Sequence, residues 1–193
     1  ALDVAASEIY DKDKHRYRFE TENKHLTSTD MIALYKKWVS EYPIISIEDG
    51  MGEADWDGWT AMTGRLGDRI SLVGDDLYTT NPALIRRGIE TEASNSVLIK
   101  LNQIGTVTET LEAIRISRQN GWGTIISHRS GETEDTTVAD LAVGTAAGQI
   151  KAGAPARGER TAKYNRLLRI EEELGAGAEF AGRSVYSRLA SPQ

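Results

Sequence analysis

Four short runs of apolar and β-branched residues recur along the chain and constrain its fold more than any other feature. Within each run the apolar residues are continuous rather than alternating, which is typical of strands buried on both faces, as in a parallel sheet. The runs occupy residues 44–47, 70–73, 96–99 and 124–127. We therefore expect a parallel sheet that is covered on both sides.

Helical patterns separate these strands. Apolar residues fall at helical spacing in the segments 31–39, 56–62, 84–89, 107–114 and 138–142. Asn81 followed by Pro82 is typical of a helix cap with a first-turn proline, and Thr106 begins a capping box. A last helix is expected from about 160 to 174, where Gly175 can stop it.

Strand and helix alternate about six times, which implies a parallel sheet with helical crossovers. Two architectures agree with this alternation, an open doubly wound sheet and part of a (βα) barrel. A whole eight-stranded barrel needs ~250 residues. The 193 residues of this chain would therefore supply about six of its units.

The composition excludes several classes of protein. The chain has no cysteine, so it can form neither a disulfide scaffold nor a thiolate metal site. No apolar run approaches the ~20 residues of a membrane-spanning helix. The formal net charge is −6, from 29 acidic and 23 basic residues. This balance gives no strong nucleic-acid signal and suits a cation site.

Acidic residues stand at the ends of three expected strands. Asp3, Glu48 and Asp75 follow successive strands, with Asp49 and Asp76 next to the last two. Because the carboxyl ends of parallel strands share one edge, where ligands bind in both architectures, these side chains should lie together. Hard oxygen ligands of this kind suit Mg²⁺. A single carboxylate at such a place is more often a helix cap or a solvated loop residue.

Basic and polar residues end the remaining strands. Lys100 and Lys151 each follow an apolar run. Burial lowers a lysine pKa and makes it usable as a base, whereas the alternative is an ordinary lysine that reaches out to solvent. His128, Arg129 and Ser130 offer a guanidinium, a hydroxyl and flexible backbone, a set that can bind phosphate or carboxylate.

These motifs together resemble those of one family. From residue 1 to about residue 182, the chain is similar to the C-terminal barrel domain of the enolases, in particular the bacterial ones. The segments that carry the resemblance are LDVAASE at 2–8, SIEDG at 46–50, GDDL at 74–77, LIKLNQIGT at 98–106, SHRSGETED at 127–135, GQIK at 148–151 and KYNRLLRIEE at 163–172. The combination of SHRSGETED with the downstream GQIK is the most specific of these features.

The resemblance implies a function, because enolases interconvert 2-phosphoglycerate and phosphoenolpyruvate with Mg²⁺ in glycolysis. The residues that it implies are the metal ligands Asp3, Glu48 and Asp75, the catalytic residues Lys100 and Lys151, and the substrate-binding residues His128, Arg129, Ser130 and Lys151. Lys100 would take the proton from C2. Lys151 would contact the substrate carboxylate and stabilise the charge that develops there, and Arg129 and Ser130 would bind the phosphate.

The resemblance also implies that parts of an enolase are absent. Nothing in the sequence matches the N-terminal domain, the first barrel strands, the glutamate that acts as the acid, its partner glutamate or the mobile loop. The start at Ala1 and Leu2, in mid-strand, also indicates a fragment. We therefore expect about six units of a TIM-type (βα) barrel over residues 1–182 and a loose tail over 183–193. Alone, such a fragment should be inactive or severely impaired.

A non-catalytic binding or assembly role is the alternative from another class. Some enolases act as surface receptors and others associate with RNA-processing assemblies. The receptor role often depends on C-terminal lysines, and residues 189–193 contain none. Mg²⁺-dependent turnover of 2-phosphoglycerate would discriminate between the two classes. Complete enolases are homo-oligomers, and a glycolytic function implies a cytoplasmic location, with a surface or secreted pool as the exception.

Overall fold

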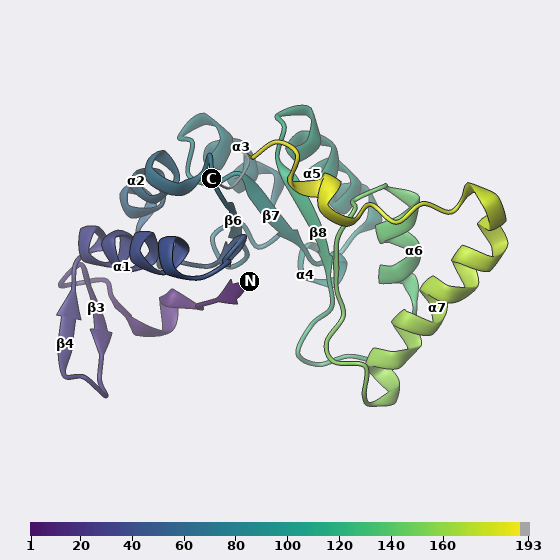
Figure 1. Ribbon diagram of the computed structural model, residues 1–193, viewed down its shortest axis with the longest axis horizontal. Coiled ribbons are helices and arrows are strands. Elements are labelled where there is room, and N and C mark those ends of the chain that lie inside the picture. The colour runs from purple at the N-terminus through teal and green to yellow at the C-terminus, as the bar shows by residue number, and fades with distance from the viewer. Residues whose placement is uncertain (190–193) are drawn as a thin grey trace.

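The computed structural model describes residues 1–189, and its central feature is one six-stranded sheet in the order β1-β5-β6-β7-β8-β9. The strands are β1 (Leu2–Asp3), β5 (Ser46–Glu48), β6 (Ser71–Gly74), β7 (Ser96–Ile99), β8 (Gly123–Ser127) and β9 (Ile150–Lys151). All neighbouring pairs are parallel. The strands follow one another in chain order, whereas a doubly wound sheet reverses its order at a switch point. The expected α/β class is confirmed, with the strands forming a half-barrel (Figure 1).

Helices lie between the strands of the half-barrel along the chain, and one more follows the last strand. They are α1 (Ser28–Glu41), α2 (Trp56–Leu66), α3 (Pro82–Glu90), α4 (Leu101–Ile104), α5 (Val107–Gln119), α6 (Thr137–Gly144) and α7 (Gly158–Leu174). The predicted caps are present: Asn81 accepts a hydrogen bond from the Ala83 N–H, and Thr106 accepts one from the Glu109 N–H. Within the described residues, no helix combines the length and the apolar character needed to cross a membrane.

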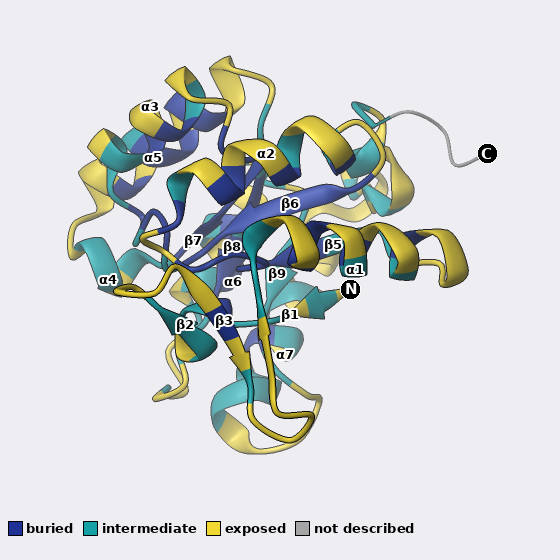
Figure 2. Cartoon of the chain, turned by 90° about the vertical axis from the view of Figure 1, so that its left-hand side faces the viewer, coloured by how far each residue is buried: buried dark blue, intermediate teal, exposed yellow. Residues whose placement is uncertain are grey.

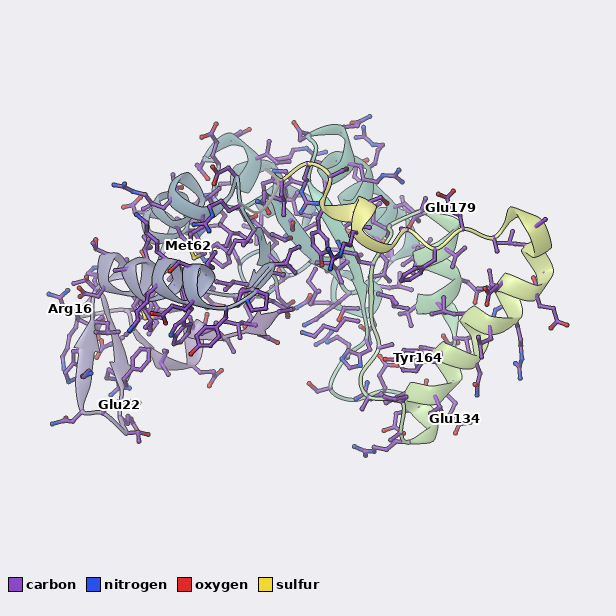
Figure 3. The ribbon with its side chains drawn as sticks, in the orientation of Figure 1. Arg16, Glu22, Met62, Glu134, Tyr164 and Glu179 are labelled. Atoms are coloured by element: carbon purple, nitrogen blue, oxygen red, sulfur yellow. The ribbon has the colours of Figure 1, made fainter. Side chains whose placement is uncertain are left out.

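The two central strands are buried along their whole length. All four residues of β6 and all four of β7 are buried (Figure 2), as their continuous apolar runs predict. Trp59 and Met62 of α2 are fully buried and belong to the same core (Figure 3). Each large apolar side chain buried in this way contributes roughly 1.5–3 kcal/mol to stability. The core therefore fixes the strands whose ends carry the candidate site.

A small antiparallel sheet lies between β1 and α1, and the sequence patterns do not predict it. It consists of β2 (Tyr10–Asp11), β3 (Arg16–Phe19) and β4 (Lys24–Leu26), preceded by a short 3-10 helix, η1 (Ala6–Ile9). Tyr17 is fully buried and donates a hydrogen bond to Asp55 Oδ2 at 2.6 Å. Figure 3 labels Arg16 at the start of β3 and Glu22 in the turn between β3 and β4. Tyr17 therefore ties the small sheet to the start of α2, whose N-cap is Asp55.

The segment after α7 runs back to the half-barrel (Figure 1). It contains two 3-10 turns, η2 (Gly175–Gly177) and η3 (Gly182–Tyr186). Arg188 then donates hydrogen bonds to Ser96 Oγ at 2.7 Å and to Ser71 Oγ at 3.1 Å, at the amino ends of two central strands. A Cβ atom on Gly123 would lie 2.8 Å from the Arg188 guanidinium, so the absence of a side chain there makes room for it. Residues 190–193, the end of the expected loose tail, lie outside the described residues.

Candidate active site at the carboxyl ends of the strands

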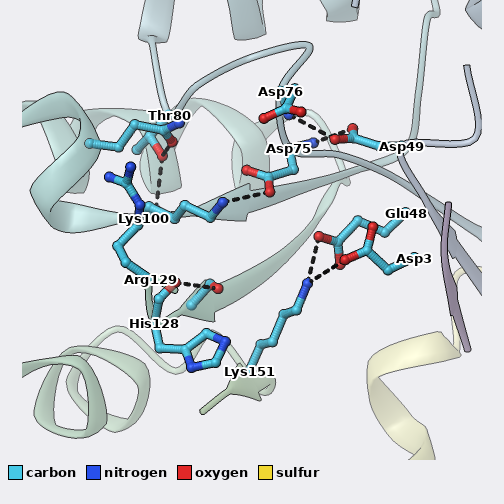
Figure 4. A network of polar contacts seen from close by, with 12 residues as sticks. Asp3, Glu48, Asp49, Asp75, Asp76, Thr80, Lys100, His128, Arg129 and Lys151 are labelled. Atoms are coloured by element: carbon cyan, nitrogen blue, oxygen red, sulfur yellow. Dashed lines mark hydrogen bonds and ion pairs between the residues drawn. The ribbon is translucent and has the colours of Figure 1, made fainter. Parts of the chain in front are cut away.

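The parallel register brings the expected site residues to one edge of the sheet. Asp3 pairs with Glu48 in the register of β1 and β5, and Ser127 pairs with Lys151 in the register of β8 and β9. In such a ladder the carboxyl ends of all strands open on one rim. Figure 4 shows the resulting arrangement, with carboxylates on one side and Lys100, His128 and Arg129 on the other. Residues far apart in sequence are thus neighbours.

Three aspartates form a compact group on the acidic side. Asp49, Asp75 and Asp76 each offer a carboxylate oxygen, and these oxygens all lie within 4.8 Å of one another. Asp49 adopts a left-handed backbone conformation, with φ of 43°, which Asp tolerates better than most residues. Its carboxylate accepts hydrogen bonds from the Asp75 N–H at 2.8 Å and the Asp76 N–H at 3.0 Å. Asp49 therefore fixes the turn that carries the other two carboxylates.

Lys151 joins the two remaining carboxylates of the acidic side. Its Nζ lies 2.7 Å from Glu48 Oε1 and 3.0 Å from Asp3 Oδ2. Burial lowers the pKa of Lys151, but the hydrogen bonds to Glu48 and Asp3 outweigh burial and the net pKa is raised. Burial also raises the pKa of Glu48, which Lys151 only partly offsets. Two carboxylates therefore share one cation.

Lys100 makes the corresponding contact with Asp75. Its Nζ lies 2.6 Å from Asp75 Oδ2, and both side chains are largely buried. The Lys100 N–H donates to the hydroxyl of Thr80 at 2.8 Å, which fixes the end of β7. Asp75 Oδ1 is buried and has no hydrogen-bond partner among the described residues. A buried carboxylate oxygen without a partner is costly, and a cation at this place would satisfy it.

These carboxylates fit a hard divalent cation. They supply oxygen donors from neighbouring strand ends, and one of those oxygens has no partner in the described part of the chain. Asp75 belongs both to the predicted ligands and to the compact group, whereas Asp49 and Asp76 were not predicted as ligands. The sequence feature that could have indicated Asp49 and Asp76 is their position directly after Glu48 and Asp75, as the second acidic residue at each strand end. Asp3 and Glu48 are joined to each other through Lys151 and form a second acidic pair at the same rim.

The loop that follows β8, residues 128–136, supplies the other side of the rim. His128 and Arg129 are half-buried and Ser130 is exposed. The Arg129 N–H donates to Glu132 Oε1 at 2.8 Å, and its guanidinium lies 3.5 Å from Asn102 Oδ1. Burial, followed by the charge of Arg160, lowers the pKa of His128. Three of the four predicted substrate-binding residues are therefore on one loop, with a guanidinium, a hydroxyl and an imidazole available, and the fourth, Lys151, is on β9.

Two residues of α7 that sequence reasoning did not assign to the site hold this loop. Arg160 contacts the His128 ring and the backbone of the residues after it. Lys163 is fully buried and lies 2.8 Å from Glu132 Oε2. Tyr164 and Glu134, labelled in Figure 3, mark the place where the loop meets the helix. The sequence feature that could have indicated Lys163 is its place in the KYNRLLRIEE segment, but a lysine in such a segment is typical of the exposed face of a helix.

A comparison with known protein families agrees with this geometry. Residues 1–189 match the family described as enolase, C-terminal TIM barrel domain. The match covers all the described residues, from the strand that carries Asp3 to the segment that carries Arg188. The chain therefore belongs to the family of enolase C-terminal TIM barrel domains.

Proposed function

We propose that the rim carries out the enolase reaction, the reversible dehydration of 2-phosphoglycerate to phosphoenolpyruvate. The observation that supports this most is the pairing of two lysines with the carboxylates. Lys100 contacts Asp75, and Lys151 contacts both Glu48 and Asp3. The proposed base, the proposed cation for a carboxylate and the proposed metal ligands thus lie at one rim of the sheet. This arrangement supplies the groups that the reaction of the family requires.

The difficult step is removal of the proton at C2, which is weakly acidic because it stands next to a carboxylate. We assign Lys100 Nζ as the group that takes this proton. Lys151 Nζ, with its raised pKa, stays charged and faces the carboxylate on which negative charge builds up. When bound by Asp3, Glu48 and Asp75, Mg²⁺ would add positive charge at that carboxylate, as in other enolase-superfamily sites.

The loop 128–136 binds the other end of the substrate. The Arg129 guanidinium and the Ser130 hydroxyl suit a phosphate, because both donate hydrogen bonds and one is charged. His128 lies beside the substrate. We assign no general acid for the departing hydroxide among the described residues, and the resemblance implies that this glutamate belongs to the N-terminal part of an enolase. The proposal also includes a cytoplasmic location and homo-oligomers for the complete enzyme, which follow from the reaction and the family.

The test is Mg²⁺-dependent formation of phosphoenolpyruvate from 2-phosphoglycerate by the full-length gene product, followed by ultraviolet absorbance. Lys100→Ala should lower turnover by about 10²–10⁴-fold, the usual contribution of a positioned base, and leave Mg²⁺ affinity largely intact. Lys36→Ala, at an exposed position on α1, is the matched control and should change neither quantity. Near-normal turnover of Lys100→Ala would refute the assignment of the base.

A binding role without catalysis remains the competing proposal. The same experiment separates the two, because the competing proposal expects the gene product to bind Mg²⁺ and 2-phosphoglycerate without turnover. Calorimetric titration of both ligands, run beside the activity assay, detects that outcome. Turnover that is lost in Lys100→Ala would exclude it.

A further inference from the structure

Arg160 lies on the first turn of α7 and makes three contacts with the loop 128–136. Its Nη1 lies 2.5 Å from His128 Nδ1 and 2.9 Å from the Arg129 carbonyl oxygen. Its Nη2 lies 3.0 Å from the Ser130 carbonyl oxygen. One guanidinium thus touches each of the three residues assigned to the substrate. The flat, five-donor geometry of arginine makes such a multiple contact possible, and lysine cannot reproduce it fully.

The contact with His128 determines where the imidazole carries its proton. Arginine is charged and can only donate, so His128 Nδ1 must accept. A neutral imidazole that accepts at Nδ1 carries its proton on Nε2, and a doubly protonated ring would place two donors against each other. We propose that Arg160 is a positioning residue that holds His128 as the neutral tautomer protonated on Nε2, so that this ring donates a hydrogen bond to an anionic substrate.

The surroundings of His128 agree with this tautomer. The backbone N–H of His128 donates to the Lys151 carbonyl oxygen at 2.9 Å, so the two residues are neighbours at the ends of β8 and β9 (Figure 4). Burial and then the charge of Arg160 disfavour a second proton on the ring, and the negative charge of Glu132 opposes them only in part. An Nε2–H donor without charge complements the guanidinium of Arg129 on the same loop. The substrate would thus meet a donor and a cation from adjacent residues.

The contacts with the backbone orient the peptide groups of the loop. The carbonyl oxygens of Arg129 and Ser130 both point to Arg160. In a trans peptide the N–H points opposite to the carbonyl. The N–H groups of Ser130 and Gly131 therefore face away from α7. Backbone N–H groups of a glycine-containing loop are a common way to bind phosphate oxygens, as at helix N-termini.

The loop has a second attachment that does not involve His128. Lys163 holds Glu132 from the next turn of α7, and Glu132 accepts the Arg129 N–H. The overall place of the loop therefore does not depend on Arg160 alone. Removal of Arg160 should change the state of the imidazole more than the fold. Arg166, further along the same helix, pairs with Asp140 and Glu173 instead and provides a matched control.

The test is long-range proton–nitrogen NMR of the histidine rings in the full-length gene product at neutral pH, with the His128 signals assigned by His128→Gln. The wild type should show a protonated Nε2 and an unprotonated Nδ1. Arg160→Gln should give a mixture of tautomers or a protonated ring. Arg160→Lys should restore the Nε2–H form at least in part, and Arg166→Gln should leave it unchanged.

Substrate affinity provides the second readout. The inference rests on the proposed function only in assigning His128 to the substrate. For Arg160→Gln we expect a KM for 2-phosphoglycerate raised on the order of tenfold, the effect of one hydrogen bond to a charged group, with a smaller change in kcat. If the gene product shows no turnover, the proposed function fails while the NMR result still decides the tautomer.

Two results would overturn the inference. One is a wild-type His128 that carries its proton on Nδ1 or is doubly protonated at neutral pH. The other is a tautomer that Arg160→Gln leaves unchanged. If Arg160→Gln does not fold, the wild-type spectrum and Arg160→Lys decide the matter, because both retain a cation at this position.

Discussion

The two sides of the rim differ in how their charges are satisfied. On the acidic side, burial raises the pKa of Asp49 to about 7 and also raises that of Glu48. On the loop side, burial would raise the pKa of Glu132, but Lys163 and the Arg129 N–H outweigh burial and the net pKa is lowered. The acidic side is therefore short of positive charge, whereas the loop side already has its partners within the chain.

The difference shows which side of the rim already has its polar groups paired before a ligand binds. Arg160 and Lys163 hold the loop 128–136 from a helix that is itself outside the rim. Asp75 on the acidic side keeps one buried oxygen without a partner among the described residues. Such a group is a reason for a cation to bind there. This difference supports the proposal that the loop side positions a substrate and that the acidic side receives a metal ion.

The largest expected effect concerns the loop side. Lys163→Met leaves Glu132 largely buried without its cation, and loss of one partner of a buried ion pair costs about 3–5 kcal/mol. Urea unfolding should show this loss in the free energy of unfolding, whereas Lys36→Met at an exposed position should not. The double variant Lys163→Met with Glu132→Leu should recover part of the loss. A single variant within about 1 kcal/mol of the wild type would show that the loop is not held in this way.

The next effect concerns the acidic side. Asp75→Asn removes a charged oxygen donor that belongs both to the predicted ligands and to the compact group of aspartates. Loss of a residue that only hydrogen-bonds to a metal ligand lowers metal affinity by roughly 10–100-fold, so loss of a ligand should lower Mg²⁺ affinity by at least this much. Calorimetric titration of Mg²⁺ measures the change, with Asp68→Asn at an exposed position as the control. An unchanged Mg²⁺ titration for Asp75→Asn would remove this residue from the site.

A smaller difference separates the two ligand sets. We expect Glu48→Gln to weaken Mg²⁺ binding about tenfold more, or ~1.4 kcal/mol, than Asp76→Asn does. The reason is that the proposed ligands are Asp3, Glu48 and Asp75, with Asp49 and Asp76 as the neighbours that shape the turn. The reverse order in the Mg²⁺ titration would assign the ion to the compact group of Asp49, Asp75 and Asp76.

The smallest effect is the titration of His128. Because its pKa in the folded protein is lowered, the unfolded chain binds the proton more readily between the two pKa values. This contribution to stability is present above the unfolded pKa near 6.5 and is lost as pH falls through it toward the folded value. An NMR titration should place the pKa of His128 below the ordinary histidine value near 6.5, and Arg160→Gln should raise it. The groups that act on this ring are Arg160, Glu132, Lys151 and Lys100. A His128 pKa at or above the ordinary histidine value would contradict the expectation.

The sequence predicts the elements that depend on local pattern. The runs at 70–73 and 96–99 lie within one residue of β6 and β7, because continuous burial requires continuous apolar residues. The caps at Asn81 and Thr106 are also local features, with donors within three residues. These local patterns do not predict the antiparallel sheet around Tyr17. Its strands are short, and its anchor is an aspartate 38 residues away.

The candidate site likewise combines features that local sequence patterns predict with features that depend on tertiary contacts. The strand-end positions of Asp3, Glu48 and Lys151 follow from a parallel sheet, which the apolar runs predict. The hydrogen bond by which Asp49 holds the Asp75 turn depends on a left-handed backbone at Asp49, and no local motif predicts that conformation. The role of Arg160 depends on how α7 returns to the loop, which only tertiary structure decides. The roles of the site residues in binding and catalysis remain predictions.

Isotope exchange at C2 of 2-phosphoglycerate tests the central claim most directly, because it reports proton removal without requiring the hydroxide to leave. The full-length gene product is incubated with 2-phosphoglycerate in heavy water, and NMR follows the loss of the C2 proton signal. We predict exchange that requires Mg²⁺ and is abolished by Lys100→Ala but not by Lys36→Ala. Mg²⁺-dependent exchange that persists in Lys100→Ala, or no exchange at all in the wild type, would contradict the claim that this rim is an enolase-type site.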